Sequence, residues 1–485
     1  MSVQSASDVP LRDVDGTPPN QTDDINQGAL ARMAYAFTQW AEKWFPDAFV
    51  FVIFAVIVVA IANFATGASP VAVAKGFGNG FWTIIPFTMQ MAMVLITGYV
   101  LATSPFCTKL IDSLARVPKS SAGAVAWVAF VTMMASYLNY ALSLVLGGLL
   151  CRALARRTDV RVDYRAAGAA AYLGIGATWA LGLSSSAAML QANPASLPKA
   201  ISDITGIIPL SETIFLWNSI AMAFVIMVMS VAIAYYSAPK GKHARTAEDM
   251  GCDVSAPSEV AERPTRPGEW PEFTPILPIL VGILAAGWLV TEFMAKSPLQ
   301  VIGNLNTYNF VLLMIGMLLH KNIHSFLKAV TKSVPTTAGV LLQFPFYGSV
   351  AIMLTSVPGS DGVTLAHHIA DLFVSIANGE TFPIVIGVYS AILGFLVPSG
   401  GGKWIIEAPY VMQAAKDLGT HMGWAVQVYN AAEAIPNLIN PFWMLPLLGV
   451  LGLKARDIVG FCVTQLVFHI PVVLFLLWIL APRAS

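Results

Sequence analysis

The sequence GFLVPSGGGKWIIEAP, Gly394 to Pro409, places a proline, a serine, three consecutive glycines and a lysine within hydrophobic sequence near the end of the chain. In lipid, each unsatisfied backbone amide or isolated charge costs several kcal/mol. Such residues are tolerated at membrane depth only where protein covers them or where they line a watery cavity. The stretch therefore predicts a hairpin tip that forms part of a binding site.

The composition is typical of an integral membrane protein. Of the 485 residues, 56% are hydrophobic and 11% are charged, and apolar runs of bilayer length recur along the chain. The 27 basic and 27 acidic residues leave no net charge, which argues against a nucleic-acid partner. The four cysteines lie far apart, and their spacing indicates neither a metal site nor a disulfide framework.

The apolar pattern predicts an all-α polytopic membrane protein. Residues 1–29 are polar and acidic and lack the layout of a signal peptide, so we expect a disordered cytoplasmic tail. An amphipathic stretch follows at 30–45. Two apolar stretches, 121–150 and 381–415, are interrupted in the middle and predict re-entrant hairpins. Nine spanning helices are expected at about 47–66, 80–103, 166–193, 212–236, 274–294, 307–320, 334–357, 424–450 and 457–481.

The distribution of basic residues supports this topology. The segments on both sides of 121–150 are strongly basic, so both should face the cytoplasm, and a single crossing would separate them. With the N-terminus cytoplasmic, 21 of the 27 Lys and Arg residues fall in inside segments and five fall outside. The remaining one, Lys403, lies at the tip of the second hairpin.

The chain also divides into two matching halves. The hairpin tips at 138–139 and 400–401 are about 260 residues apart, and each hairpin precedes a crossing broken by polar residues. The halves are residues 30–237 and 307–485, joined by a cytoplasmic loop and a linker helix within 238–306. Four crossings plus the linker start the second half from the opposite face, so the repeats should be inverted. Inverted repeats with discontinuous elements near the midplane are typical of secondary transporters.

Several motifs resemble one known family. VPSGGGKW (397–404), QFPFYG (343–348), NPFWMLPLLG (440–449) and the paired halves are similar to the short-chain fatty acid uptake (AtoE) family of the ion transporter superfamily. The resemblance spans about residue 30 to the C-terminus. It implies an elevator-type, dimeric carrier in the bacterial inner membrane for small monocarboxylates such as butyrate or acetoacetate, driven by a cation gradient.

Three positions depart from the family pattern. A His is frequent where Lys403 stands, a Trp where Tyr140 stands, and a Gly-acid pair near Ala431-Ala432. These positions should line the site, so the departures leave the exact substrate and the coupling ion open. The rival within the superfamily is a carrier of dicarboxylates or amino-acid conjugates.

The tip of the second hairpin should bind the substrate carboxylate. We expect Pro398 to end the first arm, Gly400, Gly401 and Gly402 to allow positive φ and close ligand approach, and the second arm to begin near Lys403. The free amides and dipole of that arm would attract an anion, and Ser399 could donate a further hydrogen bond. The alternative is that the glycines only make a tight turn.

Lys403 has three possible roles. Its ammonium could bind the substrate carboxylate, or it could pair with Glu407 one turn later and be structural. It could also extend to the outer surface if the tip is shallow. A single lysine facing a cavity would fit a monoanion better than a dianion.

Four polar clusters at symmetry-related places are the other candidates for substrate and ion binding. Neutral oxygens suit Na⁺, the possible coupling ion, although each residue could instead bond between helices. Glu433 could carry a proton or simply accept from a backbone amide. The predicted substrate contacts outside the glycine tip are Asn139, Ser184, Ser185, Ser186, Asn437 and Asn440, and the predicted ion-coupling residues are Ser136, Asn139, Ser143, Asn437 and Glu433.

Other polar residues have simpler interpretations. Glu212 is expected to cap a helix after Ser211, and His367 and His368 to lie on the outer surface. Gln343, Phe344 and Tyr347 could line the cavity or pack in the core; these three lie together in one predicted helix.

Two other classes of protein fit less well. A membrane enzyme would need a nucleophile with a base or a metal cluster, but the sequence has no HExxH, no GxSxG and no clustered histidines. A channel fits re-entrant hairpins, but neither tip resembles a carbonyl-lined filter.

Overall fold

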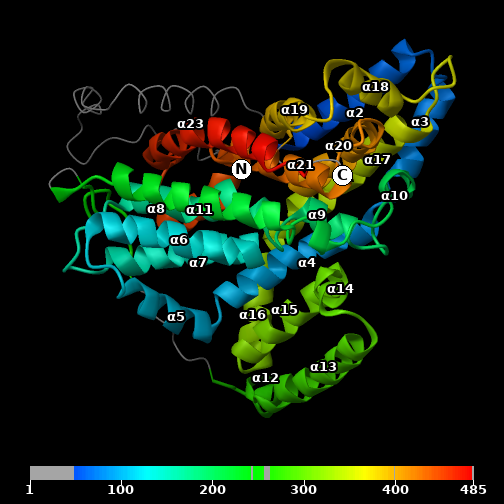
Figure 1. The fold of residues 1–485 in the computed structure, drawn as a ribbon. Coiled ribbons are helices and arrows are strands. Elements are labelled where there is room, and N and C mark those ends of the chain that lie inside the picture. The colour runs from blue at the N-terminus through cyan, green and yellow to red at the C-terminus, as the bar shows by residue number, and fades with distance from the viewer. Residues whose placement is uncertain (1–47, 242–243, 256–262, 398, 483–485) are drawn as a thin grey trace, which may run out of the picture.

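A computed structural model describes residues 48–241, 244–255, 263–397 and 399–482. Over these residues the regular structure is helical, apart from an isolated bridge between Pro358 and Thr364. The predicted N-terminal tail, the amphipathic stretch at 30–45 and Pro398 lie outside the described residues. The all-α fold class predicted from the apolar pattern is confirmed (Figure 1).

The first half starts with long apolar helices and ends with α11. Its α-helices are α2 (Ala48–Ala65), α3 (Pro70–Gly80), α4 (Ile85–Ala102), α5 (Pro105–Ala115), α6 (Ser121–Leu138), α7 (Tyr140–Ala155), α8 (Tyr164–Leu173), α9 (Ser186–Gln191), α10 (Lys199–Thr205) and α11 (Trp217–Ser237). Between α8 and α9 the chain forms a π-helical segment, η2 (Gly174–Thr178), and a 3₁₀ turn, η3 (Trp179–Leu181). Residues 182–185, where the predicted polar break begins, are non-helical and lead into α9.

The second half follows a linker. The linker contains α12 (Trp270–Phe273), α13 (Ile276–Ala295) and α14 (Pro298–Gly303). The half itself consists of α15 (Leu305–Leu319), α16 (Ile323–Ser333), α17 (Ala338–Ser356), α18 (Leu365–Ile376), α19 (Phe382–Leu396), α20 (Gly400–Asp417), α21 (Met422–Asn437), α22 (Pro441–Leu451) and α23 (Ala455–Ile479).

The helices of the two halves pack in the same order. In the first half α4 and α5 pack on α7, α6 packs on α8, and α11 packs on α6. In the second half α17 and α18 pack on α20, α19 packs on α21, and α23 packs on α19. Helices of the two halves also contact each other: α15 of the second half packs on α4, and α2 of the first half packs on α17. Figure 1 shows α6, α7, α8 and α11 gathered on the left and α17, α18 and α20 at the upper right.

Most of the predicted crossings coincide with long apolar helices. Among the described residues, seven helical segments are long and apolar enough to cross a membrane: 85–102, 121–138, 164–191, 217–237, 276–295, 323–356 and 455–479. Six of them match predicted crossings, and the seventh is α6, an arm of the first predicted hairpin. The predicted crossings at 47–66 and 307–320 form shorter apolar helices, and 424–450 is divided into α21 and α22.

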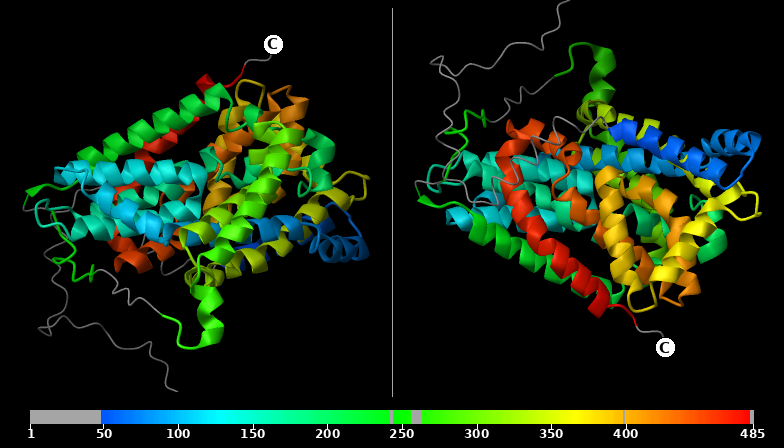
Figure 2. Two further views of the ribbon diagram at one scale, coloured as in Figure 1. Left: turned by 90° about the horizontal axis from the view of Figure 1, so that it is seen from below. Right: turned by 90° about the horizontal axis from the view of Figure 1, so that it is seen from above.

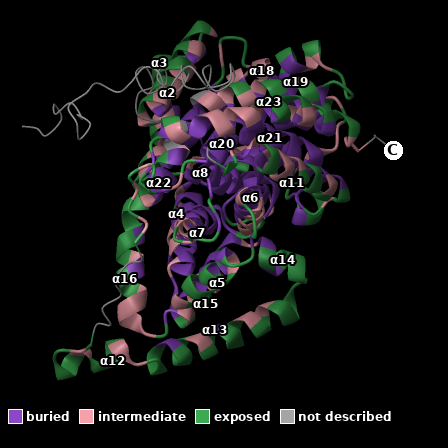
Figure 3. Cartoon of the chain, turned by 90° about the vertical axis from the view of Figure 1, so that its left-hand side faces the viewer, coloured by how far each residue is buried: buried purple, intermediate pink, exposed green. Residues whose placement is uncertain are grey.

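Burial separates a core from a lipid-facing surface. The second hairpin arm α20 and its neighbour α21 are buried along most of their length, whereas α13 buries only Pro278 and Ala285 (Figure 3). Helix α13 exposes large apolar side chains, which include Leu284 and Met294. Exposed apolar side chains on a transmembrane helix are stable when they face lipid.

The first hairpin is interrupted at one residue. Asn139 adopts an extended conformation between α6 and α7, and its side chain accepts a hydrogen bond from the Leu142 amide. Helices α6 and α7 pack along each other, as a re-entrant hairpin requires (Figures 1 and 2). The first arm begins at the predicted residue, 121, and the second arm ends at 155 rather than at 150.

One local prediction is wrong. Glu212 does not cap α11, which starts at Trp217 after Leu216. Glu212 instead ends a 3₁₀ turn at 210–212, and its carbonyl lies against Gly423, where a Cβ would approach it within 1.9 Å. The turn is therefore set by packing against the start of α21 rather than by capping.

The re-entrant path of α6 and α7 can be tested by cysteine labelling. In a background lacking Cys107, Cys151, Cys252 and Cys462, S113C and D159C should both react with an impermeant maleimide from the same side of oriented vesicles. Both positions are exposed. K199C, on the predicted outer side, is the control and should react from the opposite face. Labelling of positions 113 and 159 from opposite sides would contradict the hairpin.

Candidate functional site

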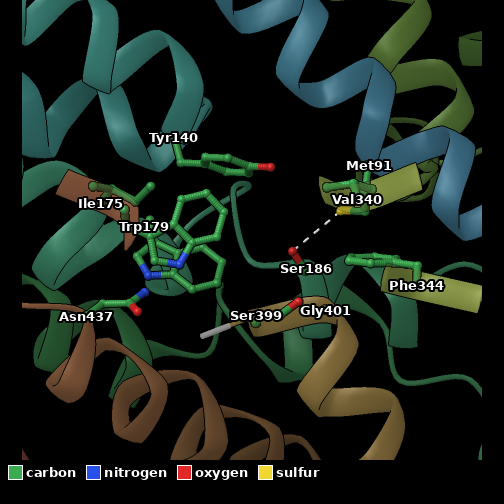
Figure 4. A pocket seen from close by; sticks show the side chains of 12 residues that line it. Met91, Tyr140, Ile175, Trp179, Ser186, Val340, Phe344, Ser399, Gly401 and Asn437 are labelled. Carbon is green, nitrogen blue, oxygen red and sulfur yellow. Dashed lines mark hydrogen bonds between the residues drawn. The ribbon is translucent and has the colours of Figure 1, made fainter. Parts of the chain in front are cut away.

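The interruptions of several helices meet at one cavity (Figure 4). Three α-helices begin there, at Tyr140, Ser186 and Gly400, and α21 ends there at Asn437. The residues that line the cavity are Met91, Tyr140, Ile175, Trp179, Ser186, Val340, Phe344, Ser399, Gly400, Gly401, Asn437 and Trp443. The cavity thus lies between the tips of the two predicted hairpins and the broken crossing of the first half.

Each of the three helix starts has a side-chain cap. Asn139, Ser185 and Ser399 accept hydrogen bonds from the backbone amide of the third residue of α7, α9 and α20, at 2.9, 3.1 and 3.2 Å. Asn and Ser are preferred at this position because their short side chains reach the free amides of the first turn. The remaining first-turn amides have no intrahelical acceptor, and the positive ends of the helix dipoles face the cavity.

The cavity wall combines neutral polar groups with apolar surface. The buried Trp179 Nε1 and Asn437 Oδ1 have no hydrogen-bond partner among the described residues. The Ser186 hydroxyl lies 3.5 Å from the Met91 sulfur, and the Tyr140 hydroxyl points into the space beside it (Figure 4). None of the described lining residues carries a formal charge. The remaining wall is apolar: Met91, Ile175, Val340, Phe344 and Trp443.

The three glycines act through close packing rather than through positive φ. The expectation of positive φ is wrong, since Gly400, Gly401 and Gly402 form the first turn of α20 and Ser399 is its N-cap. The second arm therefore begins three residues before Lys403. A Cβ at Gly400 would lie 2.0 Å from the Trp179 ring, and one at Gly402 would lie 2.1 Å from the Tyr347 ring. Only glycine allows these aromatic rings to contact the helix start.

Lys403 does not line the cavity. Its side chain is fully buried, and Nζ lies 3.1 Å from Glu407 Oε1 and 2.7 Å from Glu433 Oε2. It also donates to the carbonyl and the hydroxyl of Ser390, both at 2.7 Å. Its ammonium lies 4.5 Å from the centroid of the Tyr429 ring. Of the roles considered for this lysine, the structure contains the pairing with Glu407 and adds Glu433 as a second partner.

The other predicted residues around the first hairpin are engaged in bonds within the protein. The Ser136 hydroxyl lies 2.9 Å from that of Thr178, and Ser143 donates to the Thr132 carbonyl at 2.7 Å. Asn139 donates to the Val94 carbonyl at 3.1 Å in addition to capping α7. Ser184 donates to the Ser136 carbonyl.

A tyrosine hydroxyl donates hydrogen bonds to the backbone carbonyls at the break of the second broken crossing. The Tyr172 hydroxyl donates to the carbonyl of Asn437 at 2.6 Å and to that of Asn440 at 3.3 Å. Ser185 donates to Asn430 Oδ1 at 2.9 Å, which ties the first broken crossing to the second. Of the predicted substrate contacts, the cavity brings together Ser186, Ser399, Gly400, Gly401 and Asn437.

Sequence reasoning missed five of the twelve residues that line the cavity. The missed residues look like ordinary apolar residues of membrane helices, and only Trp443 lies in a quoted motif: Met91, Ile175, Trp179, Val340 and Trp443. Ser390, which bonds Lys403, was also missed. A lone serine within apolar sequence was the available signal for it. His367 and His368, expected at the surface, are partly exposed and lie near Asp371 and Asp361.

The fold is that of a multi-helix membrane transporter. MtrF of Neisseria gonorrhoeae, described as one of a class of antimetabolite efflux pumps, superposes with a TM-score of 0.57 at 14% identity over 93% of this chain and 96% of its own. The YdaH transporter of Alcanivorax borkumensis superposes with a TM-score of 0.53 at 16% identity over 90% and 97%. At such identities the likeness concerns the fold alone.

Sequence similarity identifies the family. A protein of Escherichia coli (strain K12) is 32% identical over 446 residues, which cover 90% of this chain and 97% of its own. A protein of Haemophilus influenzae is 32% identical over 458 residues, covering 93% and 100%. Both bear the name "Putative short-chain fatty acid transporter". Residues 29–480 match the family model described as short chain fatty acid transporter, and the chain belongs to this family.

Adding a methyl group at Gly400 should disturb the cavity. In G400A the new Cβ overlaps the Trp179 ring, and overpacking of this kind costs about 1–3 kcal/mol. We expect a lower unfolding temperature and a smaller rise of that temperature on adding a short-chain fatty acid, measured by thermal unfolding with and without this ligand. G449A is the matched control, because nothing lies within 4 Å of a Cβ there. Wild-type behaviour of G400A would show that the close contact is not needed.

Proposed function

We propose that this protein is a secondary active carrier of small monocarboxylates, such as butyrate or acetoacetate, and that a cation gradient drives it. The observation that carries the proposal is the cavity, whose wall combines three helix starts and uncharged hydrogen-bond donors with apolar residues. A short-chain fatty acid has the same two parts, one carboxylate and a short apolar chain.

The carboxylate end of the ligand fits the helix starts. The first-turn amides of Gly400 and Gly401 and the hydroxyls of Ser186, Ser399 and Tyr140 are donors on the cavity wall. A helix start stabilises an adjacent anion by about 0.3–1 kcal/mol, and by up to about 2 kcal/mol when it is partly buried. Several such starts can replace the water that a carboxylate loses on entering the protein.

The apolar part of the cavity favours a short apolar chain. Met91, Val340 and Phe344 come from α4 and α17, while Ile175 and Trp443 come from the two broken crossings. Each methylene that leaves water gains about 0.8 kcal/mol. A second charged group on the ligand would lose its water without a compensating charge on this wall.

A dicarboxylate carrier is the alternative, and the charge of the cavity argues against it. The described residues on the wall supply neutral donors, and the nearest buried lysine is already paired with two carboxylates. One negative charge can be held by dipoles, whereas a second would be buried without compensation. An amino-acid conjugate would also need space for its amide. A channel or an enzyme has less support, since both curated relatives are named as transporters.

The matched halves suggest how the site moves. We infer inverted repeats with the hairpin tips at the cavity, so that one group of helices carries the site across the membrane in an elevator-type exchange. The same proposal includes a location in the bacterial inner membrane, a cytoplasmic N-terminus and a homodimer. Exposed apolar helices such as α13 provide lipid-facing or subunit-facing surface.

The transport assay should use purified protein in liposomes with labelled acetoacetate, butyrate and succinate. We expect exchange of both monocarboxylates across the membrane and no competition from succinate. Protein-free liposomes correct for the neutral acid that diffuses through lipid. Exchange of succinate at a similar rate would favour the dicarboxylate alternative, and flux that never exceeds the equilibrium distribution under any gradient would favour a channel.

Removal of the Tyr140 hydroxyl should weaken carboxylate binding. A hydrogen bond to a charged group is worth about 1.5–3 kcal/mol, so Y140F should raise the concentration for half-maximal exchange about tenfold or more. Y235F, at an exposed tyrosine on α11, is the matched control. An unchanged concentration dependence in Y140F would exclude the hydroxyl from the site.

A further inference from the structure

A buried cluster of charges lies directly behind the cavity. Lys403 is one helical turn beyond Gly400 on α20, and Glu433 is one turn before Asn437 on α21. The Tyr429 hydroxyl donates to the Gly400 carbonyl at 2.6 Å while its ring lies beside the Lys403 ammonium. The cluster and the cavity therefore share two helices and one aromatic side chain.

The charges of this cluster do not balance. One ammonium, on Lys403, lies within 3.1 Å of two carboxylates, those of Glu407 and Glu433, and all three side chains are 0% exposed. With every group ionised the cluster has an excess of one negative charge. A buried charge without compensation is strongly unfavourable, and two carboxylates that share a site bind a proton in common.

The two carboxylates are not equivalent. Glu407 also accepts a hydrogen bond from the Ser390 hydroxyl at 2.8 Å, and Ser390 itself accepts from Lys403. The oxygens of Glu433 accept no directed hydrogen bond from the described residues, and the 2.7 Å contact with Lys403 is an ion pair. The anionic form of Glu407 is therefore better stabilised, and the added proton belongs on Glu433.

The other titratable groups around the cluster are tyrosines and one histidine, and the histidine is bonded to a serine of another helix. Tyr347 on α17 and Tyr429 on α21 are near enough to Glu433 to interact electrostatically, and Tyr389 and Tyr410 are near Glu407. On α23, the ring of His469 lies 2.9 Å from the Ser230 hydroxyl of α11. Of the described charged side chains, those in contact are Lys403, Glu407 and Glu433.

We propose that Lys403, Glu407 and Glu433 form a proton-binding site, with the exchangeable proton on Glu433, and that this proton is the coupling ion of carboxylate transport. The proposal rests on the function proposed above. A carboxylate bound one turn away adds a second negative charge and therefore favours the protonated cluster, so substrate and proton bind together. The proton enters from water on one side and leaves to water on the other. A sodium ion fits less well, because the ammonium already occupies the position between the carboxylates.

Charge balance gives a test that does not depend on transport. Infrared spectra of the reconstituted full-length protein, titrated from alkaline to acidic buffer, should contain the band of one buried protonated carboxyl group. Both E433Q and E407Q should lose it, because either change leaves one ammonium and one carboxylate. E292Q is the matched control, since Glu292 pairs with Lys296 at the surface with the same spacing. Persistence of the band in E433Q, or its absence from the parent protein, would overturn the proposal.

Transport separates failure of this proposal from failure of the proposed function. In the parent protein an imposed pH gradient should concentrate acetoacetate inside liposomes, and a sodium gradient alone should not. In E433Q the accumulation ratio should fall to unity while exchange of acetoacetate continues. Accumulation driven by sodium, or unchanged accumulation in E433Q, would refute proton coupling but not monocarboxylate transport. Absence of any exchange in the parent protein would instead refute monocarboxylate transport, and the infrared titration would still decide the proton site.

Discussion

The structure depends on one constraint, that a helix interrupted within lipid must satisfy the backbone groups which the interruption frees. Here Asn139, Ser185 and Ser399 each accept an amide hydrogen bond at a helix start. Tyr172 supplies the matching donor for carbonyls at the end of α21. Because these breaks lie together, the amides that remain free line one cavity. The same interruptions that would be costly in isolation thus supply the polar wall of the cavity.

The charged side chains near the cavity do not line it but are buried one helical turn away. The described wall residues are neutral, whereas Lys403, Glu407 and Glu433 are fully buried among α19, α20 and α21. A buried lysine next to two carboxylates avoids an isolated positive charge but leaves a negative excess. Helices α20 and α21 connect this cluster to the cavity within one turn.

The two halves share a packing order but differ in chemistry. At the first tip Asn139, Ser136 and Ser143 are bonded to neighbouring backbone and hydroxyl groups, and Tyr140 is the residue of this tip that lines the cavity. At the second tip the glycines bring the start of α20 against Trp179 and Tyr347. The two halves therefore have the same packing order, and the buried charged cluster belongs to the second half because of its side chains.

The sequence by itself determined the fold class, the family, most of the long apolar helices and the places where they break. These features are local, because hydrophobic runs, capping residues and glycine or proline clusters act within a few residues of one another. It also indicated Ser186, Ser399, Gly400, Gly401 and Asn437, which do line the cavity. Only the tertiary structure decided that Lys403 faces Glu433 rather than the cavity, that Trp179 completes the wall, and that the glycines are helical. Those outcomes depend on which helices pack together, and residues 30 or more apart in sequence meet only through that packing, which no local pattern records.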